Sequence, residues 1–374
     1  MQTYLVGGAV RDELLGRKVT ERDWVVVGAT PQQMLDAGYT QVGKDFPVFL
    51  HPKTKEEYAL ARTERKAGQG YTGFICDASA SVTLEQDLQR RDLTVNAIAQ
   101  TQDGELIDPY NGKQDLENKV LRHVSDAFSE DPLRVFRVAR FATRYHYLGF
   151  TIATDTLSLM TAMATSGELS TLTAERVWQE TARSLMERSP AIYFSVLTQC
   201  QALPVWFPEL PSPPHAVYEA LAEAAMLALP LEIRFSCLCT ALTTEAVNSL
   251  SKRLKMPNAV SSLALLAAKL SDSMQASLHA HALVDLFDTA DAWRKPERFA
   301  DLLKVFTLTS NAQGITHWDE RRRLISEALE QAKAVDIKAI IESGVKGPAI
   351  KEAVRSARCK AVDKVLASAH APQK

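Results

Sequence analysis

The segment from Tyr4 to Val27, YLVGGAVRDELLGRKVTERDWVVV, decides the fold of this chain. It begins and ends with short apolar runs, which predict buried strands. Between these runs, two glycines are followed by apolar residues at the spacing of one helix face, at Val10, Leu14 and Leu15. The segment therefore predicts a strand, a glycine turn, a helix and a second strand.

The glycine turn and two acidic residues indicate phosphate and metal chemistry. Gly7 and Gly8 would let backbone N–H groups approach a phosphate closely at the start of the helix. Glu21 and Asp23 are two residues apart at the second strand, so their side chains should point the same way and offer oxygen ligands to Mg²⁺. The alternative is a βαβ unit whose glycines only turn the chain and whose carboxylates are solvated, because short glycine patterns are weak signals.

Composition narrows the class of protein. The 374 residues suffice for about two to four domains. A formal net charge of −2 and a pI of about 6.5 exclude a wholly basic nucleic-acid binder but allow a local basic surface. The five cysteines do not form the pattern of a zinc site, which predicts structural thiols. Without a leader-type N-terminus or an apolar run of about 18 residues, the sequence predicts a cytoplasmic protein with no membrane span.

The residue pattern divides the chain into an α/β part and a helical part. Mixed patterning continues to about residue 120, with strands expected at 46–50 and 57–61. The stretch from Arg62 to Phe74 is polar, basic and rich in glycine, which predicts a mobile loop. From Asp131 onward the pattern is helical almost without interruption. We therefore expect an α+β fold, with a mixed-sheet head followed by a long helical remainder.

Two arginines and an aspartate form a second motif, in the stretch QRRDLTVNAI at residues 89–98. The forked guanidinium of arginine suits triphosphate oxygens, and Asp92 could accept a ribose hydroxyl. The alternative is that Arg90, Arg91 and Asp92 only cap a helix and pair with one another on the surface.

A third motif is EDPLRVFRVARFATR, at residues 130–144, where Asp131 is a suitable N-cap for a helix that begins at Pro132. On that helix four arginines share one stripe: Arg134, Arg137, Arg140 and Arg144. Apolar residues share another stripe, which should face a core: Val135, Val138, Ala139 and Ala142. The arginines repel one another unless anions lie against them, which favours a phosphate- or base-binding face; a solvated amphipathic helix is the alternative. Asp131 and Arg134 together would offer acceptors and donors to a base edge.

These motifs, in this order, resemble the class II CCA-adding tRNA nucleotidyltransferases, most closely the enterobacterial type. The resemblance lies in GGAVRD at 7–12 with the acidic pair, RRDLTVNA at 90–97, DPYNG at 108–112 and EDPLR at 130–134. It continues in LTAERVWQE at 172–180 and DAWRKP at 291–296.

The resemblance implies a fold and a reaction. The fold would be a polymerase-beta-like nucleotidyltransferase head at 1–125, a helical neck at 126–205 that carries the nucleotide-template helix, a helical body at 206–295 and a tRNA-binding tail at 296–374. The reaction would be the template-independent addition and repair of the 3′-terminal CCA of tRNA from CTP and ATP, with two Mg²⁺ ions and release of pyrophosphate. No protein partner is indicated.

The resemblance also implies roles for ten residues. Glu21 and Asp23 would be the catalytic metal ligands. The nucleotide would be bound by eight others: Gly8 and Arg11 beside the triphosphate, Arg91, Arg137 and Arg140 as further contacts, Asp92 at the ribose, and Asp131 with Arg134 as the template for the base.

The chain departs from the family in two places. The first metal ligand is normally aspartate, and Glu21 adds a methylene; an error of about 1 Å in position can cost about a hundredfold in rate. Close relatives also carry an HD phosphohydrolase module, but none of the eight histidines here precedes an aspartate, and residues 235–242 are apolar or hydroxyl-bearing instead. We therefore expect the phosphohydrolase activity to be absent.

Three further expectations follow. Glu57 would be a third catalytic carboxylate, and the tail would contact tRNA phosphates through basic residues: Lys346, Lys351, Arg355, Arg358, Lys360 and Lys364. The alternative for the tail is a solvated helix. Alternative activities are a poly(A) polymerase, an A-only enzyme, or a tRNA-binding protein whose catalysis is impaired by Glu21.

Overall fold

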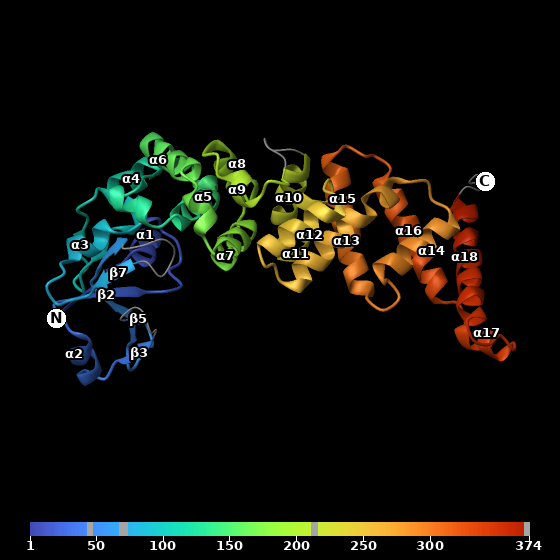
Figure 1. Cartoon of the computed structure of the whole chain (residues 1–374), viewed down its shortest axis with the longest axis horizontal. Helices are drawn as coiled ribbons and strands as arrows, with labels where there is room; N and C mark the ends of the chain where they lie inside the picture. Colours follow the sequence, from blue (N-terminus) through green and yellow to red (C-terminus); the bar gives the residue numbers. More distant parts are fainter. Residues whose placement is uncertain (43–47, 67–73, 211–215, 370–374) are drawn as a thin grey trace. The chain divides into compact units, whose positions relative to one another are not determined.

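The chain forms two compact units, unit 1 (Met1–Trp206) and unit 2 (Phe207–Lys374), in a computed structural model (Figure 1). The structure describes residues 1–42, 48–66, 74–210 and 216–369. Unit 1 combines sheet and helices, whereas the described part of unit 2 is helical, which confirms the predicted fold class. The finer division into head, neck, body and tail remains a prediction.

A seven-stranded sheet organises the first part of unit 1, in the order β3-β4-β5-β2-β1-β8-β9. Its strands are β1 (Gln2–Val6), β2 (Asp23–Val27), β3 (Thr40–Val42), β4 (Val48–Leu50), β5 (Glu57–Leu60), β8 (Ala99–Gln100) and β9 (Leu106–Ile107). β2 pairs antiparallel with β1 and parallel with β5, so the sheet is mixed, as predicted. The parallel register places Asp23 directly beside Glu57.

The helix after the glycine turn is α1 (Gly8–Leu14), but its buried face differs from the expected one. Val10 is fully buried, whereas Leu14 is 39% exposed. Arg11 and Asp12 are buried instead. The apolar spacing alone was misleading because the guanidinium of Arg11 packs against aromatic rings of another helix and forms an ion pair with Asp12.

The stretch predicted as a loop is partly a hairpin. β6 (Thr63–Lys66) pairs antiparallel with β7 (Phe74–Asp77), so the loop prediction is wrong for residues 63–66. The polar composition concealed this strand because its order comes from backbone hydrogen bonds with the other strand of the hairpin, β7. Residues 67–73 lie outside the described part, as do residues 46 and 47 of the strand expected at 46–50.

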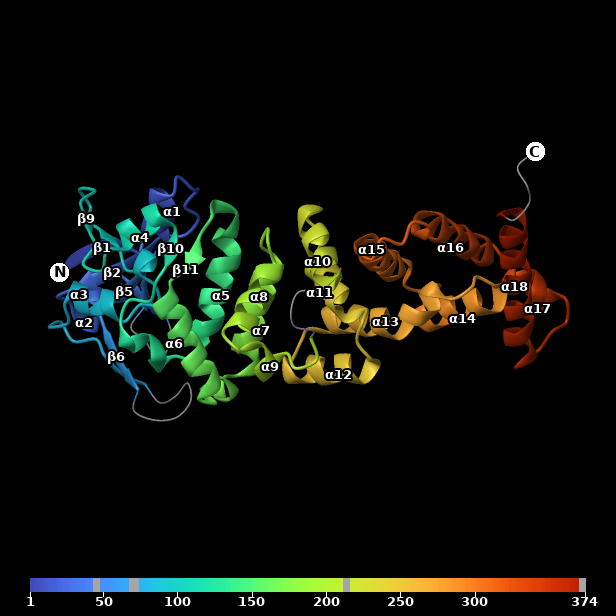
Figure 2. The ribbon, with the colours of Figure 1, turned by 90° about the horizontal axis from the view of Figure 1, so that it is seen from above.

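The helices of unit 1 follow and flank the sheet (Figures 1 and 2). They include α2 (Pro31–Asp36), α3 (Leu84–Gln89), α4 (Gly112–Asn118), α5 (Leu133–Tyr145), α6 (Thr154–Thr165), α7 (Ala174–Leu185), α8 (Ala191–Gln199) and α9 (Leu203–Trp206). The expected apolar stripe of α5 is buried: Val135, Val138, Ala139 and Ala142.

The start of α5 differs slightly from the expected one. The amide of Arg134 donates to the Asp131 carbonyl at 3.0 Å, a bond between residues i and i+3, so the regular helix begins at Leu133. The Asp131 carboxylate still accepts from the Leu133 amide, at 3.1 Å. Asp131 therefore stabilises the start of α5 from the residue before the N-cap position, which Pro132 occupies.

The described part of unit 2 contains only helices. They are α10 (Ala216–Met226), α11 (Leu231–Cys239), α12 (Thr244–Arg253), α13 (Asn258–Gln275), α14 (Ala280–Ala290), α15 (Pro296–Ala312), α16 (Trp318–Lys333), α17 (Ile337–Glu342) and α18 (Ala349–Ala369). α18 packs against α14 and α16 (Figures 1 and 2). Among the described residues, no helix has the length and apolar character needed to cross a bilayer.

Four cysteines are buried free thiols: Cys200, Cys237, Cys239 and Cys359. Burial raises the pKa of Cys200 to about 11 and that of Cys237 to about 12, so both thiols are protonated at neutral pH. This agrees with structural roles. Cys237 and Cys239 belong to the stretch where relatives carry HD residues, and the side chains from Phe235 to Cys239 are fully buried in α11.

Candidate active site

All ten residues singled out from the sequence line one cavity of unit 1, with a volume of about 550 Å³. They come from four parts of the chain that the fold brings together: the glycine turn with α1, the start of β2, the segment after α3, and α5 with its preceding turn. Eight further residues line the cavity: Gly7, Arg62, Arg90, Asn96, Leu133, Phe141, Arg144 and Arg176. The expected juxtaposition is therefore present, while the role of each residue remains a prediction.

Gly7 is the position in the turn that requires glycine. Its φ of +69° lies in the left-handed region, and a Cβ built there would be only 2.8 Å from an Nη atom of Arg91. Gly8, the residue chosen from the sequence, is the first residue of α1 and is less restricted, because its Cβ would lie 3.4 Å from Arg11. The absence of a side chain at Gly7 thus lets Arg91 approach the turn.

Both acidic residues line the cavity. Glu21 precedes β2 and Asp23 is its first residue, so the alternation of side chains within one strand does not apply to this pair. Partial burial raises the pKa of Asp23; the positive charge of Arg91 opposes this shift, and the negative charge of Glu21 adds to it. The carboxylates are thus close enough to repel each other, and a cation between them would relieve that repulsion.

A third metal ligand is not placed with this pair. Among the described residues, no three side chains of His, Cys, Asp or Glu are grouped as a metal site. Glu57 is beside Asp23 in the sheet register and lines a neighbouring cavity of about 380 Å³ together with Asp23 and Glu21. Glu21 and Asp23 suit a divalent cation as oxygen donors, and the role of Glu57 remains a prediction.

Asp92 is buried and already has partners within the protein. Its Oδ2 accepts from Nε and Nη2 of Arg137 at 2.8 and 2.7 Å, and its Oδ1 accepts from Asn96 at 2.9 Å. Although burial alone would raise the pKa of Asp92, Arg137 and the hydrogen bond from Asn96 lower it well below its usual range. Asp92 is therefore an ionised group that orients Arg137 toward the cavity.

Asp131 and Arg134 are each held by other parts of the protein. Arg134 donates to the carbonyls of Ala127 and Arg90, at 2.6 and 2.5 Å. The second carboxylate oxygen of Asp131 accepts from Arg176 of α7 at 2.8 Å. Both side chains line the cavity in fixed orientations, one as an acceptor and the other as a donor.

Hydrogen-bond acceptors of the protein itself offset part of the positive charge of the arginine stripe on α5. Arg140 donates to Glu180 of α7 at 2.5 Å and stacks over Phe141, with 4.4 Å from its guanidinium carbon to the ring centroid. Arg11, on α1, donates to the Asn96 side chain at 2.5 Å. The expected repulsion between guanidiniums is therefore reduced before any ligand binds, and the arginines are oriented in advance.

Comparisons with known proteins identify the family to which the chain belongs. Residues 3–122 match the family described as the poly A polymerase head domain, and residues 149–212 match the probable RNA and SrmB-binding site of polymerase A. A CCA-adding enzyme of Alteromonas mediterranea is 56% identical to this chain, over 97% of this chain and 99% of the relative. The chain belongs to the CCA-adding enzyme family.

Solved CCA-adding enzymes have the same fold. One, in complex with ATP, has a TM-score of 0.71 at 20% identity and covers all of this chain and 91% of its own. The Thermotoga maritima CCA-adding enzyme in complex with tRNA has a TM-score of 0.66 at 20% identity, over 99% of this chain and 92% of its own. Membership of the CCA-adding enzyme family identifies the chain as a nucleotidyltransferase and favours CCA addition over the poly(A) and A-only alternatives.

Two of the basic residues expected to meet tRNA in the tail have other partners. Arg355 forms an ion pair with Asp285 of α14 at 2.7 Å. The guanidinium carbon of Arg358 lies 3.7 Å from the ring centroid of Trp293, and burial lowers the pKa of Arg358. Both arginines therefore hold α18 against its neighbours. The remaining four are exposed: Lys346, Lys351, Lys360 and Lys364.

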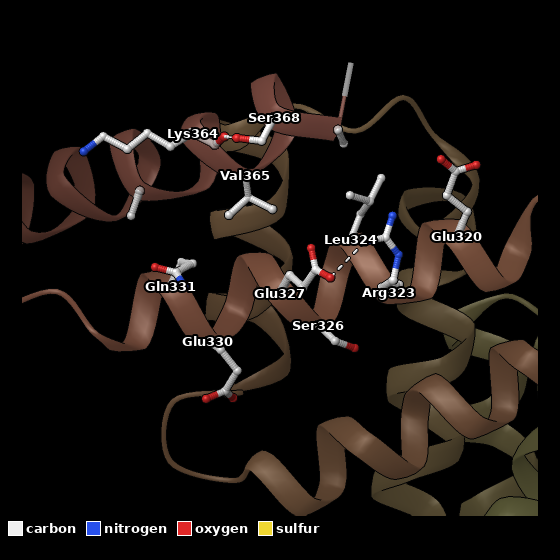
Figure 3. Close-up of a pocket in the computed structure, with 12 residues that line it drawn as sticks. Glu320, Arg323, Leu324, Ser326, Glu327, Glu330, Gln331, Lys364, Val365 and Ser368 are labelled. Atoms are coloured by element: carbon white, nitrogen blue, oxygen red, sulfur yellow. Dashed lines mark hydrogen bonds and ion pairs between the residues drawn. The ribbon is translucent and has the colours of Figure 1, made fainter. Parts of the chain in front are cut away.

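A groove of about 870 Å³ lies between α16 and α18 of the tail (Figure 3). Three glutamates line it, Glu320, Glu327 and Glu330, against Arg323 and Lys364. Arg323 and Glu327 pair with each other at 3.0 Å. The groove thus contains more acidic than basic groups and does not suit a phosphate.

Proposed function

We propose that this chain adds and repairs the 3′-terminal CCA of tRNA, using CTP and ATP and releasing pyrophosphate. The observation that carries this proposal is the convergence of ten residues from four parts of unit 1 on one cavity, in a member of the CCA-adding enzyme family. The tRNA substrate and a cytoplasmic location are part of the proposal.

The reaction would be attack of the tRNA 3′-hydroxyl on the α-phosphate of the bound nucleotide. Glu21 and Asp23 would hold Mg²⁺, which when bound stabilises the attacking and leaving oxygens. Arg11 and Arg91 would neutralise the triphosphate beside the glycine turn. Because Asn96 and Asp87 hold these two guanidiniums, they would meet the phosphates without reorganisation.

Selection of the base would rest on Asp131 and Arg134. A carboxylate and a guanidinium side by side offer acceptors and donors to the Watson–Crick edge of cytosine or adenine. Their anchors, Arg176 for Asp131 and two backbone carbonyls for Arg134, restrict the positions that a base can occupy. Uracil and guanine present a different order of donors and acceptors and would leave a buried polar group unpaired.

The decisive experiment incubates the protein with tRNA that lacks its last three nucleotides, together with labelled CTP and ATP and Mg²⁺. Addition of two cytidines and one adenosine is the expected result. Incorporation of A alone would identify an A-only enzyme, and a long A tract would identify a poly(A) polymerase. Binding of tRNA without incorporation would indicate impaired catalysis.

Two subsidiary proposals have their own tests. If Glu57 is a third catalytic carboxylate, Glu57→Ala slows incorporation, and normal turnover would reject that role. If the HD chemistry is absent, the protein neither opens the ring of 2′,3′-cyclic phosphate nucleotides nor releases phosphate from 3′-phosphate nucleotides with any divalent metal. Phosphate release that persists after further purification of the protein, and that the Asp23→Asn variant retains, would contradict this expectation.

A further inference from the structure

An exposed tyrosine of unit 1 lies in contact with two arginines, and each of the three residues follows the C-terminal end of a different helix. Tyr147 follows α5 and is 42% exposed. The guanidinium carbons of Arg17, beyond α1, and of Arg188, beyond α7, lie 5.7 and 4.6 Å from its ring centroid. Arg17 also donates a hydrogen bond to the Tyr147 hydroxyl. We call these three residues the tyrosine cluster.

The tyrosine cluster is joined to the active-site cavity through a shared ring. Arg144 lines the cavity and lies 5.7 Å from the ring centroid of Tyr145. Arg17 lies 5.4 Å from the same centroid. A row of guanidiniums therefore runs from the arginines of α5 that line the cavity, through Arg17, to Tyr147.

The ion pairs that these arginines form with carboxylates of the protein become weaker from the cavity toward Tyr147. Near the cavity, Arg140 meets Glu180 at 2.5 Å, and toward the end of α5, Arg144 meets Asp12 at only 3.5 Å. Arg17 and Arg188 have no carboxylate partner within salt-bridge distance among the residues that the structure describes.

Glu187 is the acidic group that faces this end of the row. Burial raises the pKa of its carboxyl, against the opposing charges of Arg144, Arg140 and Arg17. The carboxylates of Glu187, Glu180 and Asp12 together offset only part of the charge of these three arginines and Arg188, which leaves an excess of positive charge. A purely structural explanation is that cations are favourable near helix C-termini, but such interactions are weak when the cation is exposed to solvent. They also do not account for the aromatic ring between the guanidiniums.

We propose that the tyrosine cluster is a second RNA subsite, which binds phosphodiesters of the tRNA strand whose 3′ end enters the active-site cavity. Two guanidiniums offer forked donors to phosphate oxygens, and Tyr147 orients both of them. The subsite rests on the proposed function because it holds the substrate of that reaction. Its effect is to fix the strand upstream of the reacting hydroxyl.

The test is the double variant Arg17→Gln/Arg188→Gln, with Arg183→Gln as the matched control. Arg183 is an exposed arginine of α7 outside the tyrosine cluster. The double variant should raise the Kd and KM for tRNA about tenfold or more, leaving kcat at saturating tRNA and the KM for CTP unchanged. The slope of log affinity against log salt should decrease by about 0.7 for each phosphate of a single strand that the variant no longer binds. Arg183→Gln should behave as wild type.

Two further measurements separate the possible failures. The Tyr147→Phe variant keeps the ring but removes the hydroxyl to which Arg17 donates, and it should show a smaller loss of tRNA affinity. Wild-type affinity and salt slope in the double variant would overturn the subsite, as would an equal loss of CTP binding. If wild-type protein binds tRNA but adds no nucleotide, the proposed function fails, while the affinity measurements still decide the subsite.

Discussion

Asp23 lies at the start of a central strand of the sheet, and the charge of Arg91 only partly offsets its burial and the neighbouring negative charge. It is the first residue of β2, retains contact with solvent and lies near a second acidic side chain, Glu21. A residue that contributes so little to packing can be changed without loss of the fold. Its effect on the reaction can therefore be measured separately from its effect on stability.

We predict that Asp23→Asn reduces nucleotide incorporation by at least about a hundredfold, because an amide is a poor ligand for a hard cation and removes one of two charges. Incorporation of labelled CTP into shortened tRNA measures the effect. Asp103→Asn, at an exposed loop position, is the control and should be fully active. An active Asp23→Asn variant with an unchanged melting temperature would refute the metal assignment.

Asp131 links the start of α5 to the base that the site selects. We predict that Asp131→Ala lowers the preference for CTP and ATP over UTP and GTP by about tenfold or more, because it removes the acceptor that a base amino group would meet. Competition assays with all four nucleotides measure the preference. An unchanged preference would exclude Asp131 from base selection, even if the overall rate fell.

At the scale of elements, α5 is the part of unit 1 on which the site depends. One face is buried in the core, and the opposite face carries the arginines, each oriented by a different neighbour. The neighbour of Arg137 is Asp92, which follows α3. The Asp92–Arg137 ion pair therefore connects the sheet-containing part of unit 1 to α5.

We predict that Asp92→Asn lowers the free energy of unfolding of unit 1 by about 1–3 kcal/mol at neutral pH, because it leaves Arg137 without its charged partner. The pKa of Asp92 is depressed in the folded state, so its contribution is complete above the unfolded value of about 4 and is lost as pH falls below it. Urea unfolding at several pH values, with hydrogen exchange of α5 amides, measures both effects. A variant that loses stability equally at pH 3 and pH 7 would contradict this explanation.

Local patterns predicted the helix and the arginine stripe of α5, but they could not predict the partners of its arginines. Glu180 and Arg176 belong to a motif that is evident in the sequence, yet their partners, Arg140 and Asp131, are 40 and 45 residues away. Such pairs arise from tertiary packing, which helix periodicity cannot predict. The burial of Arg11 in place of Leu14 has the same cause.

At the scale of the whole molecule, a chain with a formal net charge of −2 must bind a polyanion through local groups of basic residues. The structure removes Arg355 and Arg358 from those available in the tail, because both are engaged with α14 or Trp293. It leaves exposed lysines on and before α18.

We predict that the triple variant Lys346→Gln/Lys351→Gln/Lys360→Gln weakens tRNA binding, because each glutamine removes a charge that would neutralise a phosphate. The slope of log affinity against log salt should decrease by about 0.9 for each phosphate of duplex RNA that is no longer neutralised. CTP binding should not change. Lys338→Gln, on α17, is the control because that lysine already faces Glu342 at 3.7 Å. A triple variant with the salt slope of wild type would show that these lysines are only solvated.

The stacking of Arg358 on Trp293 also provides an optical reporter. Indole emission depends on the charges near its ring, and here a guanidinium of one helix lies against a tryptophan that follows another. Detachment of α18 from α14 would remove that charge and shift the fluorescence of Trp293. With the other four tryptophans replaced, the undocking of the last helix could be timed without any added dye.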